Sequence, residues 1–292
     1  MDLYNSLKYT FILLFSLSLF TQCKSQSDKK EKSKNEYKNS ETYDFSEPKV
    51  IKLPQALDEI SGITYYAKDT SVFAVIDEDG LLFKIPLKNP TALKEWVFDK
   101  PRDFEDIILK DSVFYVMVSN GDIDILSFKG KDIHVEKVDF PNASKKNNEF
   151  EALYYDSATN RVVLMCKNCE QDDKMHISSF YLSDSAKEYQ PLTPIETTSF
   201  KENKGGERER IKPSAAAIDP VTKSLYVLCS VNKLVFVQDT TGKISEVIKL
   251  NPKIYKQPEG MCFTPQGDLI ISNEFGGSGS ANLLLLKNKK RL

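Results

Sequence analysis

The tetrapeptide Phe150-Glu151-Ala152-Leu153 recurs in variant form at four other places in the chain, each time just before a strand-like run. Its counterparts are Ile60-Ser61-Gly62-Ile63, Phe104-Glu105-Asp106-Ile107, Pro213-Ser214-Ala215-Ala216 and Pro258-Glu259-Gly260-Met261. The second position is Ser or Glu in every copy, and successive copies are 44, 46, 63 and 45 residues apart. One four-stranded blade of a β-propeller occupies about 40–45 residues. The spacing therefore predicts one blade for each copy.

The residues after each copy follow a common order of a strand-like run, a turn and a second apolar run. After the copy at 150–153, the turn lies at 156–160 and the second run at 162–165. Short β-branched and aromatic runs separated by turn residues are typical of β-hairpins. A third strand is expected at residues 81–85, 123–128, 177–182, 234–238 and 283–286, and a fourth at residues 96–98, 135–138, 196–200 and 247–250.

The fifth repeat has three expected strands, and the N-terminal part of the chain offers a fourth. Val50-Ile51-Lys52-Leu53 resembles Val247-Ile248-Lys249-Leu250, and we expect it to pair with residues 283–286. Such pairing would hide two sheet edges that otherwise invite aggregation. The sequence thus predicts an all-β fold, a five-bladed β-propeller closed by an N-terminal strand. An irregular β-sandwich is the alternative, but sandwiches do not repeat at this period.

Composition excludes some classes of function. The chain has 40 basic and 42 acidic residues and a net charge of −2, and no basic stripe with interleaved aromatic residues appears, so we expect no nucleic-acid partner. His134 and His176 are the two histidines. A His-rich zinc or iron centre is therefore disfavoured.

Residues 1–47 indicate export from the cytoplasm. An apolar stretch at residues 9–20 is too short to span a bilayer and is typical of a signal-peptide core. Residues 24–47 are almost entirely polar, which predicts a flexible tether. We therefore expect a signal peptide at residues 1–22, a tether at residues 23–47 and the propeller at residues 48–292.

Cys23 stands at the junction of the signal core and the tether. This arrangement resembles a bacterial lipoprotein signal, in which the cysteine is lipidated and becomes the mature N-terminus. Phe20-Thr21-Gln22 departs from the usual residues ahead of that cysteine. Lipidation would anchor the protein to a membrane of the bacterial cell envelope, which we expect to be the outer membrane. A cleaved, soluble secretory protein is the alternative.

Four further cysteines lie in the expected propeller. Cys166 and Cys169 form a Cys-x-x-Cys pair at the end of a strand, whereas Cys229 and Cys262 fall within strands. Such a pair can be redox-active or half of a metal site. No second pair and no thioredoxin-like pattern accompany it, which favours buried small residues or one structural disulfide.

The repeated phrase also predicts where function lies. The innermost strand of each propeller blade lines the central channel, so each copy should lie at one rim of that channel. The polar second positions are Ser61, Glu105, Glu151, Ser214 and Glu259. The second strands return to the same rim and end in polar groups. The candidate metal ligands at this rim are Glu59, Glu105, Glu151, Glu259, Asn120 and Asn273.

Carboxylates held this close together need a counter-charge to stay ionised. A hard cation such as Ca²⁺, which takes six to eight oxygen ligands, would supply it, and so would a basic ligand. Oxygen donors without nearby His or Cys favour Ca²⁺ over zinc or copper. A solvated acidic rim with no function is the third alternative.

In their longer form the five phrases resemble a known family. They read Leu57-Asp58-Glu59-Ile60-Ser61-Gly62-Ile63, Asp103-Phe104-Glu105-Asp106-Ile107, Asn148-Glu149-Phe150-Glu151-Ala152-Leu153, Lys212-Pro213-Ser214-Ala215-Ala216-Ala217-Ile218 and Gln257-Pro258-Glu259-Gly260-Met261. These phrases are similar to those of the SdiA-regulated (YjiK-like) family of bacterial envelope β-propeller proteins. The resemblance covers nearly the whole expected propeller. It implies a cation in the channel and leaves the activity undefined. A more distant resemblance, to phytase-like and lactonase propellers, implies Ca²⁺ that binds an anionic or carbonyl group.

Three classes of function follow. The first is a lipid-anchored, Ca²⁺-binding propeller that recognises a small anionic ligand or an envelope protein without catalysis. The second is a Ca²⁺-dependent hydrolase of a phosphoester or lactone, in which Glu105, Glu151 or Glu259 serves as ligand or base. The third is a structural envelope protein with an incidental acidic mouth.

Overall fold

The computed structural model describes residues 37, 39–141, 148–170, 172–173, 175–183, 186–198, 200, 209–277 and 279–290. The chain divides into two units, residues 1–38 and residues 39–292, and every strand described below belongs to the second. Within the described ranges, no helix is both long enough and apolar enough to cross a membrane.

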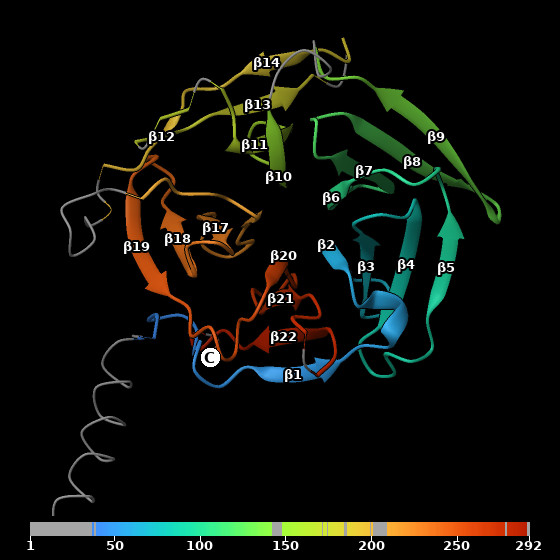
Figure 1. Cartoon of the computed structure of the whole chain (residues 1–292), viewed down its shortest axis with the longest axis horizontal. Helices are drawn as coiled ribbons and strands as arrows, with labels where there is room; N and C mark the ends of the chain where they lie inside the picture. The colour runs from blue at the N-terminus through green and yellow to red at the C-terminus, as the bar shows by residue number, and fades with distance from the viewer. Residues whose placement is uncertain are drawn as a thin grey trace, which may run out of the picture. The chain divides into compact units, whose positions relative to one another are not determined.

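In the described residues the strands form five antiparallel four-stranded sheets, which are the blades of a propeller (Figure 1). Blade 1 contains β2 (Ile60–Tyr66), β3 (Ser71–Ile76), β4 (Leu81–Pro86) and β5 (Lys94–Val97). Blade 2 contains β6 (Phe104–Lys110), β7 (Val113–Val118), β8 (Ile123–Lys129) and β9 (Asp132–Val138). Blade 3 contains β10 (Glu149–Asp156), β11 (Arg161–Asn168), β13 (Ser179–Leu182) and β14 (Tyr189–Pro191). Blade 4 contains β16 (Ala215–Ile218), β17 (Leu225–Cys229), β18 (Leu234–Gln238) and β19 (Ile244–Lys249).

Blade 5 is assembled from both ends of the folded unit. It contains β20 (Pro258–Phe263), β21 (Leu269–Asn273), β22 (Asn282–Leu286) and, at its outer edge, β1 (Lys49–Lys52). β1 runs antiparallel to β22, with Val50 opposite Leu284 and Ile51 opposite Leu283. The five-bladed propeller closed by an N-terminal strand is thus confirmed, and the closing strand pairs with the predicted partner. A short 3₁₀ helix, η1 (Gln55–Leu57), follows β1.

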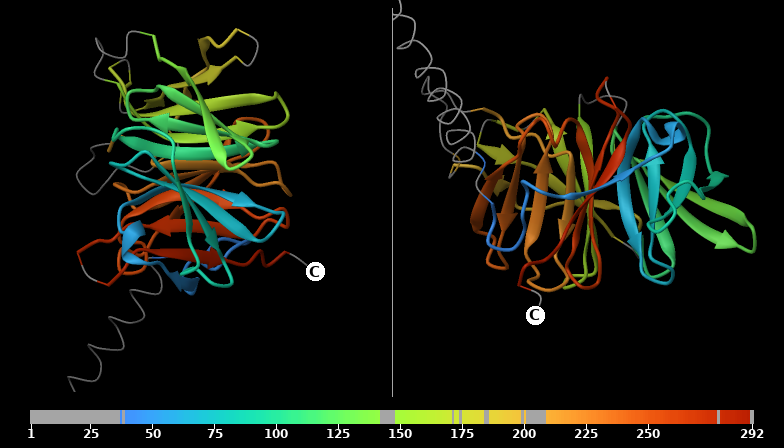
Figure 2. Two further views of the ribbon diagram at one scale, coloured as in Figure 1. Left: turned by 90° about the vertical axis from the view of Figure 1, so that its right-hand side faces the viewer. Right: turned by 90° about the horizontal axis from the view of Figure 1, so that it is seen from below.

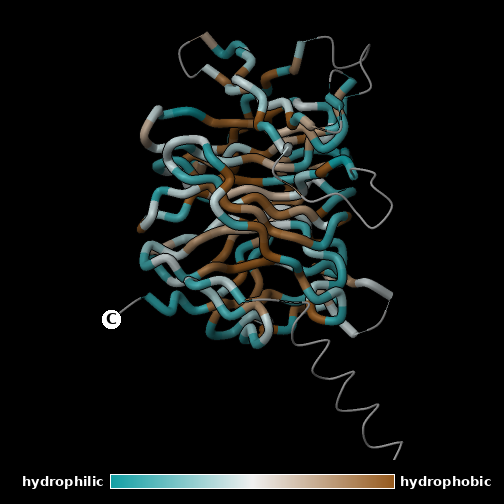
Figure 3. Tube along the Cα trace, turned by 90° about the vertical axis from the view of Figure 1, so that its left-hand side faces the viewer, coloured by the Kyte–Doolittle hydropathy of each residue, from teal (hydrophilic) through white to brown (hydrophobic). Residues whose placement is uncertain are grey.

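Neighbouring blades pack face to face around the ring (Figure 2). β3 shows how the sequence achieves this, because all six of its residues are buried. Alternate side chains of a strand point to opposite faces. Val72 and Ala74 accordingly pack in a cluster shared with blade 5, whereas Phe73 and Val75 pack in a cluster shared with blade 2. Figure 3 shows hydrophobic segments concentrated in the interior of the folded unit and hydrophilic segments toward its edges.

The innermost strands β2, β6, β10, β16 and β20 contact one another in succession around the axis, and β20 contacts β2 to complete the circle. Figure 1 shows them at the centre of the ring. The start of each innermost strand is therefore brought to a common opening, which places the repeated phrase as expected.

Blade 3 departs from the expected strands. The fourth strand predicted at residues 196–200 is wrong, because β14 takes that place beside β13. β15 (Ile195–Glu196) instead pairs with β12 (His176–Ile177) in a separate two-stranded sheet. Tyr189 fixes β14 in position, since its single hydroxyl proton is shared between the carbonyl oxygens of Gly121 and Val138 in blade 2, each 3.0 Å from the hydroxyl oxygen.

The N-terminal boundary of the propeller also differs from the expectation. Tyr43 and Phe45 are buried in the cluster between blades 4 and 5. The Tyr43 hydroxyl donates to the carbonyl of Gly267 at 2.6 Å, and the Tyr255 hydroxyl donates to that of Phe45 at 3.1 Å. The tether predicted at residues 23–47 therefore extends too far, because two aromatic side chains suffice to dock its last part on the core.

Gly62, in the first copy of the phrase, packs directly against blade 2. A Cβ atom at this position would lie 2.4 Å from the Cα of Asp106. We expect Gly62→Ala to destabilise the protein by about 1–3 kcal/mol through overpacking, measured by thermal or urea unfolding. Gly276→Ala is the matched control, because its nearest neighbour would be at an ordinary 3.4 Å. Equal unfolding midpoints for the two variants would contradict this packing.

Candidate functional site

β-Bulges turn the repeated phrase toward the channel. The strand register shifts between Phe104 and Asp106, between Phe150 and Ala152, and between Pro258 and Gly260. The skipped residue in these three places is Glu105, Glu151 and Glu259. A bulge leaves its extra residue outside the ladder and re-aims its side chain. The three glutamates therefore leave the alternation of the blade and face the channel.

A cavity of about 310 Å³ lies where the phrases meet. All five second positions line it, three as glutamates and two as the buried Ser61 and Ser214. The carboxylates around it are Asp77, Asp103, Glu105, Glu149, Glu151, Glu259 and Glu274. They come from the starts of innermost strands and the ends of second strands. Lys167 is the one basic side chain among the lining residues of the described chain.

The six predicted metal ligands are brought together only in part. Glu105, Glu151 and Glu259 line the cavity, whereas the other three do not. Glu59 is exposed. Asn120 hydrogen-bonds to Asp122 through both ends of its amide and shapes the turn before β8. Asn273 is buried in blade 5, and its amide donates to the carbonyl of Ile254 at 2.8 Å. Metal binding by these residues stays a prediction.

One group of three carboxylates contains the predicted ligand Glu105 together with Asp77 and Asp103, which were not among the six predicted ligands. Oxygens of Asp77, Asp103 and Glu105 all lie within 4.8 Å of one another. Asp77 follows β3 and Asp103 precedes β6, so neither occupies the repeated position. The sequence signal for them is acidic residues at the end of a second strand and just before the next innermost strand, two places that meet at one rim.

Crowding shifts the pKa values of these groups upward. Burial, followed by the charges of Asp103 and Asp77, raises the pKa of Glu105 to about 9. Burial and the neighbouring Asp103 raise the pKa of Asp77 to about 7. Burial and the charge of Glu274 raise the pKa of Glu259 to about 7. Each shift means that ionisation of the cavity is costly without a cation.

Lys167 is the counter-charge that the chain itself supplies. Its ammonium forms an ion pair with Glu151 and lies 3.1 Å from a carboxylate oxygen of Glu149. Its charge also lowers the pKa values of Glu105 and Glu259 from what burial alone would give. The lysine therefore acts on four of the seven carboxylates that line the cavity.

A disulfide at the end of β11 positions Lys167. Cys166 and Cys169, on either side of it, form a disulfide, whereas Cys229 and Cys262 are free and buried. The structural disulfide weighed in the sequence is thus present. Arg210 braces the loop, because its guanidinium donates to the Asn168 side chain and to the Cys169 carbonyl, both at 2.9 Å.

A second acidic cluster differs from the channel because its charges are compensated. Arg102 lies 2.9 Å from Asp99, 3.2 Å from Asp122 and 3.0 Å from Asp124, and Lys137 adds a contact to Asp99 at 2.6 Å. Three carboxylates thus share two cations. This network joins the segment between blades 1 and 2 to blade 2 and is structural.

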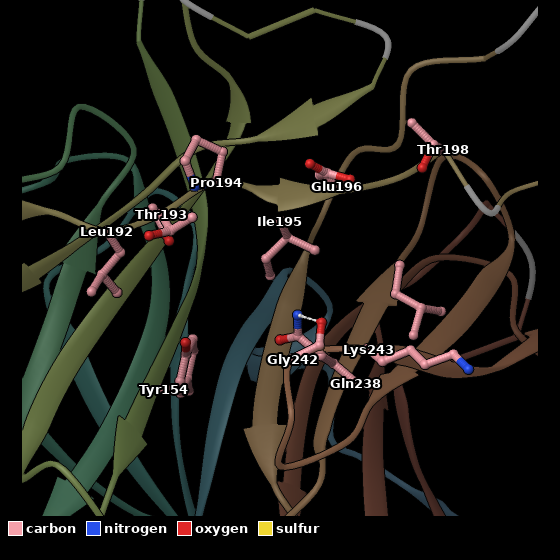
Figure 4. A pocket seen from close by; sticks show the side chains of 12 residues that line it. Tyr154, Leu192, Thr193, Pro194, Ile195, Glu196, Thr198, Gln238, Gly242 and Lys243 are labelled. Carbon is pink, nitrogen blue, oxygen red and sulfur yellow. Dashed lines mark hydrogen bonds between the residues drawn. The ribbon is translucent and has the colours of Figure 1, made fainter.

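The larger cavity, of about 590 Å³, lies between blades 3 and 4 (Figure 4). Its lining includes Tyr154, Leu192, Pro194 and Ile195, with few charged groups. Gln238 there donates to the Gly242 carbonyl at 2.7 Å. Titratable groups gather in the channel instead, which makes the channel the candidate site.

The raised pKa values predict how stability depends on pH in the presence of a chelator. Glu105, Asp77 and Glu259 hold protons in the folded protein at pH values where the unfolded chain, with carboxyl pKa values near 4, has released them. Their stabilising contribution is complete below about pH 4 and is lost as the pH rises through about 7 to 9. We expect the melting temperature to fall between about pH 5.5 and pH 8.5, measured by calorimetry.

A matched pair of variants tests whether the channel carboxylates cause this decrease of melting temperature with pH. Glu259→Gln should flatten it, whereas Glu95→Gln, at an exposed position on β5, should leave it unchanged. A melting temperature that rises across the same pH range in the wild type would contradict the assignment.

Comparison with solved structures shows which proteins share this architecture. The luciferin-regenerating enzyme gives a TM-score of 0.53 at 12% identity, over 84% of this chain and 96% of that one. A PQQ-bound aldose sugar dehydrogenase from Streptomyces coelicolor gives 0.51 at 10%, over 83% and 99%. The calcium-binding protein regucalcin from Agrobacterium tumefaciens gives 0.50 at 10%, over 86% and 95%. At these identities the likeness establishes the propeller fold alone.

Sequence comparison identifies the family. No curated protein matches the chain. Residues 43–275 match the family model described as SdiA-regulated, and this match spans most of the folded unit and all five copies of the repeated phrase. The chain therefore belongs to the SdiA-regulated family, as its repeated phrases indicate.

Proposed function

We propose that this protein is a lipid-anchored propeller of the bacterial cell envelope that binds Ca²⁺ in its central channel and recognises a ligand or partner at the acidic mouth. The observation that supports the metal site most strongly is the group formed by Asp77, Asp103 and Glu105, whose oxygens lie within 4.8 Å of one another. Ca²⁺–oxygen distances are about 2.3–2.6 Å, so two ligands of one ion are at most about 5 Å apart. The three carboxylates meet this requirement as they stand.

The chemistry of the donors supports the choice of ion. The cavity lining consists of carboxylates, hydroxyls, an amide, Lys167 and one valine, with no His or Cys among the described residues. Hard oxygen donors of this kind suit Ca²⁺ rather than zinc or copper. When bound, the ion would neutralise the carboxylates and offer its remaining coordination positions to water or to an oxygen of a ligand.

The size of the cavity supports ligand recognition beside the ion. A volume of about 310 Å³ is roughly ten times the 30 Å³ that one water occupies in the liquid. A single cation therefore fills a small part of it. Ser214, Ser230 and Gln257 also line the cavity, and they add neutral hydrogen-bonding groups to it. This combination suits a small anionic ligand or the polar tip of a partner protein.

A hydrolase is the second candidate, favoured by one observation. The pKa of Glu259, raised to about 7, suits a general acid or base at neutral pH. Hydrolysis of an aryl phosphate or a lactone that requires Ca²⁺ and is lost in Glu259→Gln would establish it. Hydrolysis unchanged by that substitution would remove Glu259 from the reaction.

Ca²⁺ should stabilise the folded protein by mass action, because the unfolded chain has no such site. A Ca²⁺ concentration 100 times the Kd is expected to add about 2.7 kcal/mol and raise the melting temperature relative to excess chelator. Glu105→Gln should reduce this shift strongly, and Glu95→Gln should not. The same melting temperature in millimolar Ca²⁺ and in chelator would count against the site.

Cys23 lies outside the described residues, and its lipidation rests on the sequence alone. Cys23→Ser, expressed in the native host or a related bacterium, should shift the protein from the membrane fraction to the soluble envelope fraction and abolish labelling by a palmitate analogue. A variant that still partitions fully into membranes would rule out the anchor at this residue.

A further inference from the structure

The cavity already contains one cation, the ammonium group of Lys167. This group pairs with Glu151 and lies 3.1 Å from Glu149. Through its charge it also acts on Glu105, a member of the three-carboxylate group, and on Glu259 on the far side of the ring. A divalent cation that enters the cavity therefore meets a positive charge that is already in place.

The backbone that carries Lys167, at the end of β11, is held by three sets of contacts. The Cys166–Cys169 disulfide closes the loop, the pairing of Glu149 with Asn168 attaches it to β10, and Arg210 holds Asn168 and Cys169 from outside. The side chain itself is only half-buried and has four rotatable bonds. It can withdraw from the carboxylates while the loop keeps its place.

We propose that Lys167 is a tethered competitor of the channel cation: its ammonium group, held at Glu149 and Glu151, opposes through its charge a divalent ion at Asp77, Asp103 and Glu105, and it withdraws when that ion binds. This inference rests on the proposed Ca²⁺ site and adds how that site is regulated. If a monovalent cation replaces the ammonium group, the net charge of the cavity stays the same and little binding free energy is gained. A divalent ion brings two positive charges and therefore neutralises more carboxylates than the lysine does. Lys167 therefore sets selectivity against monovalent cations and weakens Ca²⁺ binding toward the range of about 10⁻⁴–10⁻³ M typical of extracellular sites.

Lys233 provides a control within the same channel wall. It follows β17 and its charge also lowers the pKa of Glu259, but its ammonium donates to the carbonyl of Lys256 at 2.7 Å and does not line the cavity. Lys233→Met and Lys167→Met remove the same formal charge with a side chain of similar length. A difference in Ca²⁺ affinity between the two variants therefore reports the position of the Lys167 ammonium group in the cavity rather than the loss of one charge from the protein.

The test is calorimetric titration of Ca²⁺ into the chelator-stripped, full-length protein at one pH and one ionic strength. Lys167→Met is expected to lower the Kd for Ca²⁺ at least about tenfold, as is reasonable for removal of a close charge. Lys233→Met should change it less than about threefold. Lys167→Gln replaces Lys167→Met if the methionine variant does not fold.

The outcomes separate this inference from the proposed function. If the wild type binds Ca²⁺ and Lys167→Met binds it equally or more weakly, the competitor role is wrong and the Ca²⁺ site stands. A tightening of the same size in Lys233→Met also overturns it, since net charge would then explain the effect. Ca²⁺ binding by Lys167→Met but not by the wild type supports the competitor role in its extreme form. If neither binds, both the Ca²⁺ site and the competitor role are wrong.

Discussion

The antiparallel pairing of β1 with β22 is the interaction on which the rest of this molecule depends. It closes the ring in the register that places Ile51 opposite Leu283. Closure removes two exposed sheet edges and brings β20 against β2. Only in a closed ring do the five innermost strands begin around one opening, so the channel cavity follows from this pairing. The aromatic anchors Tyr43 and Phe45, just before β1, add packing at the neighbouring junction between blades 4 and 5.

The convergence of carboxylates in the channel has an electrostatic cost, and the fold reduces this cost in two ways. Seven carboxylates line a cavity that contains one lysine. Lys167 compensates Glu149 and Glu151 directly. Glu105, with a pKa of about 9, keeps its proton at neutral pH instead. Neither protonation nor pairing with the lysine removes the repulsion completely, because the carboxyl groups remain close together. Around Arg102 each of three carboxylates contacts a cation, whereas seven carboxylates share one lysine in the channel, and this excess of negative charge is the feature that supports the proposed cation.

The sequence predicted the features that depend on repetition. The period of the phrase gave the number of blades, and the likeness between residues 50–53 and 247–250 gave the closing strand. It failed where a single local contact decides the outcome. Tyr189 binds across to blade 2 and makes β14 the fourth strand of blade 3. The importance of Lys167 was also hidden, because the β-bulge that aims Glu151 toward it has no clear sequence pattern, and the Cys-x-x-Cys pair around it indicated a disulfide but not a charge in the channel.

We propose that the channel binds a divalent cation through carboxylates that the ring brings together. The most direct measurement is a high-resolution crystal structure of the full folded unit grown in millimolar Ca²⁺, with anomalous data to identify the ion. The account predicts an anomalous peak within about 2.3–2.6 Å of oxygens from Asp77, Asp103 and Glu105. A cavity that contains ordered water and the Lys167 ammonium alone, at a saturating Ca²⁺ concentration, would contradict it.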